Sequence, residues 1–303
     1  MSKLTIVGAG NVGSQAAFYA ALKNLTEEIV LVDVVEGLPQ GKALDLLEAM
    51  PIAGSNVQIK GSNNYEDSKD SDIVVITAGI ARKPGMTRED LIGINTKIMT
   101  SVVTEVTKYS PDCILIVVTN PLDAMVQLAY QLSGFPKQRV LGMAGVLDTA
   151  RFRTFLAQEL KADVNQIEAM VLGSHGDLMV PVLSNCKVNG TAITELLPAQ
   201  KIKEIVQRVK DGGAEIVSLL KTGSAFFAPG LAIAQMIEAI IKDQKKVLPC
   251  SVLLQGEYGV NDLFIGVPVR LGKAGAEEIV ELDLNAVEKS DLHKSVEHVR
   301  ELI

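Results

Sequence analysis

A histidine between two glycines is the strongest candidate for proton transfer in this chain. His175 stands in the run Gly173-Ser-His-Gly-Asp177, directly after an apolar stretch, whereas His293 and His298 fall in a charged terminal segment typical of solvated surface. An imidazole has an ordinary pKa of about 6.5, so His175 could donate or accept a proton near neutral pH. Taken alone, the residue could equally be a structural histidine whose hydrogen bonds are satisfied.

Two further patterns carry charges that could serve the same chemistry. Asp148 and Arg151 are three residues apart in a helical stretch and therefore share one face, as a surface ion pair would also do. The Gly/Pro-containing segment 81–88 follows a predicted strand and contributes Arg82 and Arg88. A solvated loop is the alternative for that segment.

A glycine fingerprint near the start of the chain predicts a dinucleotide site. The apolar run from Leu4 leads into Gly8, Gly10 and Gly13 with the spacing G-x-G-x-x-G, and a helical pattern follows. Such glycines allow a tight turn, close approach of a pyrophosphate and close helix–strand packing. Asp33 ends the second predicted strand 20 residues after Gly13, where a carboxylate can bind a ribose 2′-hydroxyl. Because Val34-Val35-Glu36 brings no arginine to neutralise a 2′-phosphate, NAD is favoured over NADP.

Small and polar residues end two other predicted strands. Thr77-Ala78-Gly79 ends one, and Val118-Thr119-Asn120-Pro121 ends another. In a parallel sheet both carboxyl ends open onto one crevice, although turn-forming residues alone would give a similar pattern.

The elements that must position these residues alternate in the first half of the chain. Apolar strands separated by helices predict a doubly wound parallel sheet covered on both faces. The predicted strands are Leu4–Gly8, Ile29–Asp33, Val57–Gly61, Ile73–Thr77, Cys113–Thr119 and Val140–Met143, and the predicted helices are Asn11–Lys23, Gly41–Met50 and Asn95–Tyr109.

The second half reads as an α+β domain. Predicted strand pieces are Glu168–Gly173, Val180–Asn185, Leu248–Gln255 and Leu263–Leu271, and predicted helices are Leu147–Leu160, Pro198–Lys221, Gly230–Lys242 and Asn285–Leu302. The fold class is therefore α/β, a Rossmann sheet followed by an α+β catalytic domain. The predicted domains are residues 1–143 and 144–303.

Composition excludes several other classes. The 303 residues are 48% hydrophobic and 21% charged, with 29 basic and 36 acidic side chains and a net charge of −7, which argues against a general nucleic-acid partner. No apolar run approaches the ~18 residues of a membrane span, and we expect a soluble cytoplasmic protein. The widely spaced Cys113, Cys186 and Cys250 predict buried reduced thiols, with neither a disulfide framework nor a metal site.

Taken together, the motifs resemble the lactate/malate dehydrogenase family, and within it the malate dehydrogenases that are similar to lactate dehydrogenase. The resemblance covers essentially the whole chain and rests on GAGNVG, TAGIARKPGMTREDL, TNPLD, GVLDTAR, GSHGD and KTGSAFFAP. It implies reversible NAD-dependent oxidation of (S)-malate to oxaloacetate. The cofactor-binding residues that it implies are Gly8, Gly10, Asn11, Val12, Gly13, Asp33, Thr77, Ala78, Gly79, Asn95, Val118 and Asn120.

The resemblance also implies roles in catalysis. His175 would carry the proton, Asp148 would hold the other ring nitrogen, and Arg151 would bind the C1 carboxylate as a planar fork. Arg88 would polarise the carbonyl, and the loop Ile80–Asp90 would close over the substrate. Asn120 would hydrogen-bond the reacting oxygen.

Substrate choice depends on two positions in this resemblance. Arg82 would face a second carboxylate where lactate enzymes usually carry glutamine, and Ala225 is small where those enzymes tend to carry threonine. Ala81 departs from the proline that is frequent before this arginine, which bears on loop stiffness. The alternatives are a lactate or broad 2-hydroxy-acid dehydrogenase and, from another class, a non-catalytic NAD-binding protein. For assembly we expect a homotetramer, or else a homodimer, paired through the helices after Gly37 and Pro198.

Overall fold

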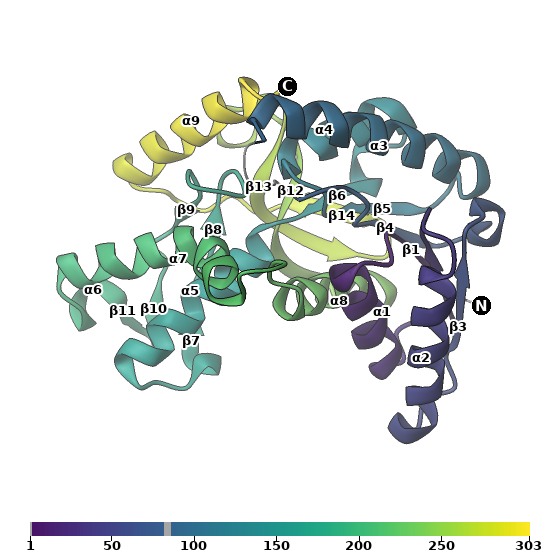
Figure 1. Cartoon of the computed structure of the whole chain (residues 1–303). Coiled ribbons are helices and arrows are strands. Elements are labelled where there is room, and N and C mark those ends of the chain that lie inside the picture. Colours follow the sequence, from purple (N-terminus) through teal and green to yellow (C-terminus); the bar gives the residue numbers. More distant parts are fainter. Residues whose placement is uncertain (1, 82–85) are drawn as a thin grey trace.

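A mixed sheet runs through the centre of the molecule (Figure 1). The computed structural model describes residues 2–81 and 86–303. Within them a nine-stranded sheet has the order β14-β13-β12-β6-β5-β4-β1-β2-β3. Its strands are β1 (Lys3–Val7), β2 (Glu28–Val32), β3 (Gln58–Ser62), β4 (Ile73–Ile76), β5 (Ile114–Val117), β6 (Val140–Met143), β12 (Lys246–Gln255), β13 (Asn261–Gly272) and β14 (Gly275–Ile279).

Strands β1 to β6 form the predicted doubly wound parallel sheet. β1 pairs in parallel with both β2 and β4, so the strand order reverses between β1 and β4. The strands β4, β5 and β6 are buried along their whole length. Continuous burial requires cover on both faces, which the crossover helices provide. The predicted fold class is confirmed.

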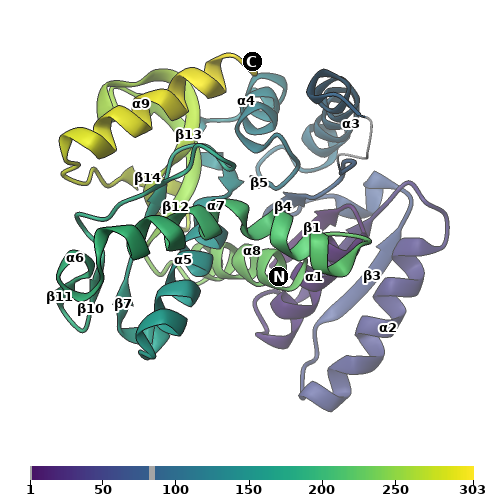
Figure 2. The same cartoon turned by 60° about the vertical axis from the view of Figure 1, so that its left-hand side comes forward.

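Helices cover the two faces in separate groups (Figure 1). On one face, α1 (Asn11–Leu22) and α8 (Phe227–Ile241) pack side by side, and α2 (Leu38–Ala53) lies beyond α1, as Figure 2 shows. On the other face lie α3 (Arg88–Tyr109) and α4 (Leu122–Ser133), whose apolar side chains form a second core. The helices therefore cover both faces of the parallel sheet and leave its carboxyl edge for a site.

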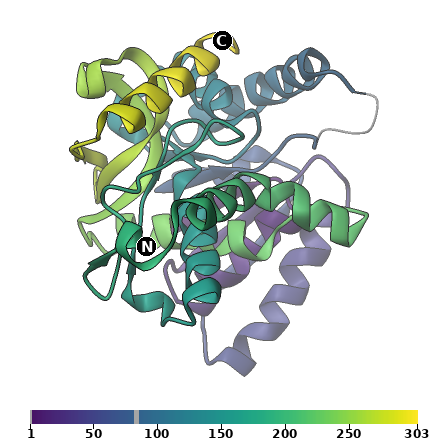
Figure 3. The same ribbon diagram turned by 90° about the vertical axis from the view of Figure 1, so that its left-hand side faces the viewer.

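The second half of the chain extends the same sheet and adds a lobe. β12 pairs antiparallel with β6, so the central sheet continues from the first half of the chain into the second. The domain boundary between residues 143 and 144 stays a prediction. The lobe has its own apolar core, and green α7 crosses in front of the sheet in Figure 3. Its elements, with the terminal helix, are α5 (Gly145–Leu160), β7 (Ile167–Glu168), β8 (Val171–Leu172), β9 (Val180–Pro181), β10 (Lys187–Val188), β11 (Thr191–Ala192), α6 (Ile193–Leu196), α7 (Ala199–Leu220) and α9 (Ala286–Arg300). Single-turn 3₁₀ segments cover Tyr65–Ser68, Lys137–Arg139, Val164–Gln166 and Glu257–Gly259.

Helix starts account for the main differences from the prediction. α3 begins at Arg88 and not at Asn95, because Thr87 and Asp90 form a reciprocal capping box. Arg88 therefore stands in the first turn of a helix, which corrects its predicted place on a loop. α4 was not predicted at all, although the left-handed Gly134 ends it in the usual way.

The predicted state of the cysteines is confirmed, since all three are buried free thiols. Burial raises the pKa of the Cys113 and Cys186 thiols to about 12, so they stay protonated and unreactive at neutral pH. No helix in the described part of the chain has the length and apolar character that a membrane crossing would need.

Candidate active site

The carboxyl edge of the parallel sheet opens into a cleft of about 490 Å³. Its walls come from both halves of the chain: the ends of β4 and β5 on one side, and α5, α7 and the loop after β8 on the other. Predicted site residues that line the cleft are Val12, Thr77, Gly79, Val118, Asn120, Arg151, His175 and Ala225. Residues as far apart in the sequence as Val12 and Pro229, which are separated by 217 positions, therefore face one space.

Two residues that line this cleft, His175 and Arg151, are joined by hydrogen bonds to the buried Asp148. Asp148 is 1% exposed, and its Oδ2 lies 2.8 Å from His175 Nδ1. Its Oδ1 accepts a hydrogen bond of 3.1 Å from Arg151 Nη1. Because Nδ1 is engaged by the carboxylate, Nε2 is the ring nitrogen that can reach a molecule in the cleft. The structure thus brings together the histidine and the helical pair that the sequence singled out separately.

The environment of His175 favours its charged form. Burial alone would lower the pKa of the imidazole, but the charge and hydrogen bond of Asp148 outweigh burial and raise this pKa above its ordinary 6.5. Arg151 opposes the rise and Asp123 supports it. An imidazolium held by a carboxylate is a proton donor that works at neutral pH.

The Arg151 side chain lies against a glycine of the neighbouring helix α7. A Cβ at position 212 would lie 3.1 Å from Arg151 Cδ, so Gly212 of α7 leaves the space that the arginine stem occupies. The side chain is 14% exposed and lines the cleft. Among the described residues its guanidinium makes one hydrogen bond, to Asp148, and its other N–H groups suit recognition of a carboxylate.

The glycine fingerprint has the geometry that a pyrophosphate needs. Gly8 has φ = +106°, and a Cβ there would lie 2.6 Å from Thr77 Oγ1. A Cβ at Gly13 would lie 1.9 Å from the Gly8 carbonyl oxygen, which fixes how closely α1 packs on β1. By contrast, a Cβ at Gly10 would meet no described atom within 4 Å beyond its chain neighbours. That open space beside the N-terminus of α1 fits a diphosphate.

Asp33 is oriented by the backbone of the fingerprint itself. Its Oδ2 accepts a 2.7 Å hydrogen bond from the Ala9 amide, and its Oδ1 accepts one of 3.0 Å from the Val35 amide. The carboxylate therefore stands at the end of β2 beside the glycine turn, as the spacing predicted. The residues present fit a dinucleotide with free ribose hydroxyls.

Asn95 occupies a different position from the other predicted cofactor residues. It is fully buried. Its side-chain Oδ1 accepts a hydrogen bond from the Ile80 backbone amide, and its Nδ2 donates to the Ile80 carbonyl and, at 2.7 Å, to the Asn120 carbonyl. It thereby ties the end of β4 to the end of β5. Direct contact between Asn95 and a cofactor stays a prediction, as do the contacts of Asn11 and Ala78.

The side chains of two predicted arginines lie outside what the structure describes. Arg82 falls in the segment 82–85, outside the described residues, and only the backbone of Arg88 is described. Their roles toward a substrate remain predictions from the sequence.

Several cleft-lining residues were missed by the sequence reasoning. Leu147 lies one turn before Arg151, and Lys210, Gly213 and Val217 follow the i, i+3, i+7 pattern of one helix face. That periodicity marks a common face but does not say what the face contacts, because the partner is folded against it from elsewhere in the chain. The others are Ile80, Ala81, Leu91, Thr119, Met143, Gly176, Met179, Ser224 and Pro229.

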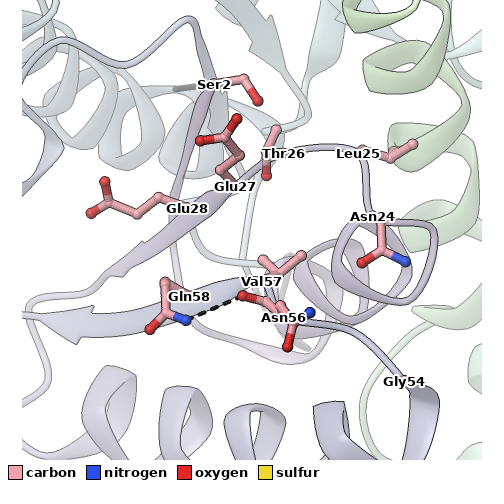
Figure 4. A pocket seen from close by; sticks show the side chains of 10 residues that line it. All are labelled: Ser2, Asn24, Leu25, Thr26, Glu27, Glu28, Gly54, Asn56, Val57 and Gln58. Carbon is pink, nitrogen blue, oxygen red and sulfur yellow. Dashed lines mark hydrogen bonds between the residues drawn. The ribbon is translucent and has the colours of Figure 1, made fainter.

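A larger hollow of about 740 Å³ lies near the amino-terminal ends of the parallel strands, opposite their carboxyl edge; Figure 4 shows its lining. It is lined near the starts of β2 and β3 by residues including Asn24, Glu27 and Gln58. Its described lining has neither an imidazole nor a guanidinium, so the catalytic chemistry belongs to the smaller cleft.

Two family models match consecutive parts of the chain. The "lactate/malate dehydrogenase, NAD binding domain" model matches residues 2–142, and the "lactate/malate dehydrogenase, alpha/beta C-terminal domain" model matches residues 145–303. The chain belongs to the lactate/malate dehydrogenase family. The resemblance inferred from the sequence motifs is thus confirmed.

Relatives in this family include enzymes of both kinds. The chain is 54% identical over 299 residues to the malate dehydrogenase of Pelodictyon phaeoclathratiforme, covering 99% of this chain and 96% of the relative. The crystal structure of Cryptosporidium parvum malate dehydrogenase is 46% identical, with a TM-score of 0.96 and coverage of 99% and 97%. The Cryptosporidium parvum lactate dehydrogenase, solved with lactic acid and NAD, is 41% identical, with a TM-score of 0.96 and coverage of 99% and 96%.

Proposed function

We propose that this protein is an NAD-dependent enzyme that catalyses the reversible oxidation of (S)-malate to oxaloacetate. The observation that supports this most directly is that His175 and Arg151 line one cleft beside the dinucleotide edge of the sheet and both hydrogen-bond to the buried Asp148. Full-length relatives named malate dehydrogenase agree with the activity predicted from the sequence. Gly8, Gly10 and Asp33 would hold the NAD, which would supply the hydride acceptor for oxidation and the hydride donor for reduction.

His175 moves the proton that accompanies this hydride. In reduction, imidazolium Nε2 gives its proton to the carbonyl oxygen as alkoxide character develops; in oxidation, neutral Nε2 removes the hydroxyl proton. Asp148 fixes the tautomer through Nδ1 and stabilises the cation, which is the form that the local pKa shift favours. Neither residue changes its hydrogen-bond partner between the two directions.

Arg151 and Asn120 position the substrate in this proposal. The guanidinium of Arg151 binds the C1 carboxylate, and its bond to Asp148 keeps it beside the histidine. Asn120, exposed at the end of β5, donates a hydrogen bond to the reacting oxygen. Arg88 adds positive charge near the same oxygen.

Preference for a dicarboxylate is assigned to Arg82, which would pair with the second carboxylate. Leaving such an arginine buried against a methyl group costs about 3–5 kcal/mol. Ala225 lines the cleft and leaves room for the longer substrate. Arg82 and Ala225 therefore decide which substrate is preferred, whereas the hydride and proton transfers do not depend on these two residues.

The decisive experiment measures NADH and NADPH oxidation with oxaloacetate and with pyruvate. We expect oxaloacetate with NADH to give the highest kcat/KM. A higher kcat/KM with pyruvate would instead favour the second candidate, a lactate or broad 2-hydroxy-acid dehydrogenase. Binding of NADH without turnover of either keto acid would favour a non-catalytic NAD-binding protein.

For assembly we propose a homotetramer in the cytoplasm, with a homodimer as the alternative. Apolar side chains are exposed on the two helices named from the sequence, including Leu44 and Ile52 on α2 and Leu219 on α7. Exposed apolar patches of this kind favour contact with another subunit. Light scattering of the purified protein distinguishes the tetramer, the dimer and the monomer.

A further inference from the structure

The loop that carries His175 is held in place by three other elements. Gly173 pairs with Gly266 of β13 through two backbone hydrogen bonds. The Ser174 amide donates to Ser295 Oγ of α9 at 2.7 Å. The His175 amide donates to Asp123 Oδ2 of α4 at 3.2 Å. The third contact acts on the catalytic residue itself.

Asp123 is a buried carboxylate that the mechanism above does not use. It lies in the first turn of α4, is 4% exposed, and accepts a second hydrogen bond, of 2.7 Å, from Ser251 Oγ of β12. Ser251 is itself fully buried. Burying a charged carboxylate costs free energy, and two hydrogen bonds from neutral donors offset only part of that cost. That cost shows in its pKa, which burial raises to about 6 despite the bonds from Ser251 and the His175 amide.

His175 is therefore held at two points by two carboxylates. Asp123 and Asp148 each stand in the first turn of a helix that follows a parallel strand, where the helix N-terminus favours negative charge. Asp148 bonds the ring and Asp123 bonds the main chain of the same residue. Among the described groups, the charges that act on the imidazole are Asp148 and Arg151 from α5 and Asp123 from α4.

We propose that Asp123 is a positioning residue for proton transfer, which fixes His175 through its backbone amide while Ser251 fixes the carboxylate. With both the backbone and Nδ1 held, rotation that would swing Nε2 away from the substrate is prevented. This inference relies on the proposed function for the identity of the reaction. The hydrogen bonds that carry it are independent of the substrate.

Three variants separate geometry from charge. Asp123→Asn keeps an acceptor for the His175 amide and offers an amide donor to Ser251 Oγ. Asp123→Ala removes both bonds, and Ser251→Ala removes only the second. Because misplacement by about 1 Å can cost about 10²-fold in rate, we expect Asp123→Ala to lose roughly 10–10²-fold in kcat. Its KM for NADH should stay within about twofold of the wild-type value, since the cofactor edge is untouched.

The conservative variant Asp123→Asn should restore kcat but should not restore the pH at which His175 titrates. Asp123→Asn should recover kcat at low pH to within about threefold of wild type. Its kcat/KM for keto-acid reduction should fall off at a lower pH, because a neutral side chain no longer supports the imidazolium. Ser251→Ala should lie between wild type and Asp123→Ala in kcat.

A readout without turnover tests the same point. The chain has three histidines, so NMR of histidine-labelled protein can follow each imidazole, with His293 and His298 as internal references. In Asp123→Asn and Asp123→Ala the His175 titration should move to lower pH while the two references stay unchanged. If wild type turned over neither keto acid, the proposed function would fail, and this titration would still decide the role of Asp123.

Glu288 supplies the matched control. It is another buried carboxylate, 5% exposed, which accepts hydrogen bonds from the Ser184 amide and hydroxyl, and neither residue lines the cleft. Glu288→Ala should lower Tm without changing kcat or the His175 titration. The proposal is overturned if Asp123→Ala behaves like Glu288→Ala, with a lower Tm, wild-type kcat and an unmoved His175 titration.

Discussion

His175 Nδ1 lies 2.8 Å from Asp148 Oδ2, although the two residues are 27 positions apart in the chain. Asp148 comes from the first turn of α5 and His175 from the loop after β8, so the contact exists only once α5 and this loop pack together within the lobe. The bond decides which ring nitrogen can meet a substrate and raises the pKa of the imidazole. The predictions for the reaction follow from this pair.

Replacing His175 by asparagine should abolish turnover and spare cofactor binding. Asparagine cannot change protonation state near neutral pH, and general acid–base catalysis contributes about 10²–10⁴-fold. We expect kcat to fall by at least that factor while the NADH dissociation constant, measured by fluorescence titration, stays within about twofold. His293→Asn, which changes an exposed histidine, is the control. Near-wild-type turnover in His175→Asn would remove the residue from the mechanism.

Replacing Asp148 by asparagine should change the pH dependence of the reaction. The carboxylate raises the pKa of His175, so in wild type the imidazolium needed for reduction persists above pH 6.5. Without that charge the pKa of His175 falls. As the pH rises, kcat/KM for oxaloacetate reduction should therefore begin to fall at a lower pH than in wild type, so the loss is greater at pH 8 than at pH 6. Asp177→Asn removes an exposed charge from the same loop and should leave the profile unchanged. An identical profile for Asp148→Asn would contradict the role of the pair.

Two alanine substitutions in the glycine fingerprint should affect different properties, one the stability of the protein and the other its affinity for the cofactor. At Gly13 the new Cβ would lie 1.9 Å from the Gly8 carbonyl oxygen, so α1 must shift, and overpacking of this kind costs about 1–3 kcal/mol. We expect Gly13→Ala to lower Tm without cofactor. At Gly10 the Cβ meets open space, so Gly10→Ala should keep Tm but raise KM for NADH by filling the space beside the diphosphate. Equal effects of the two changes on Tm would contradict this division.

Asp33 should set the choice between the two nicotinamide dinucleotides. Its carboxylate is oriented by the amides of Ala9 and Val35 and would repel a 2′-phosphate. Asp33→Ser removes that charge, so the ratio of kcat/KM for NADH to that for NADPH should fall by at least about tenfold, the equivalent of roughly 1.4 kcal/mol. Asp45→Ser, a charge-matched change on α2, should leave the ratio as it is.

Arg82 should discriminate between the two keto acids. Arg82→Gln removes the partner of the second carboxylate and the cost of facing a methyl group. The ratio of kcat/KM for oxaloacetate to that for pyruvate should therefore fall by roughly 10²–10⁴-fold. Arg300→Gln, which makes the same charge change on the exposed end of α9, serves as the control. An unchanged ratio would show that another group selects the substrate.

The sequence by itself determined the parallel sheet, the glycine turn and the chemical types in the site. Periodicity and spacing are local signals, so β1, β6 and the start of α1 agree with their predicted positions to within a residue. At Arg88 the apolar pattern alone misplaced the helix start, because the capping box of Thr87 and Asp90, which is also a local signal, lengthens α3 beyond that pattern.

Only the tertiary structure decided how distant groups meet. Nothing in the neighbourhood of Asp123 in the sequence indicates that its carboxylate holds the backbone of His175, 52 positions later. Nor does the sequence show that Asn95 braces two strand ends, or that Gly212 makes room for Arg151. These relationships depend on packing between elements far apart in the chain, which local propensity does not encode.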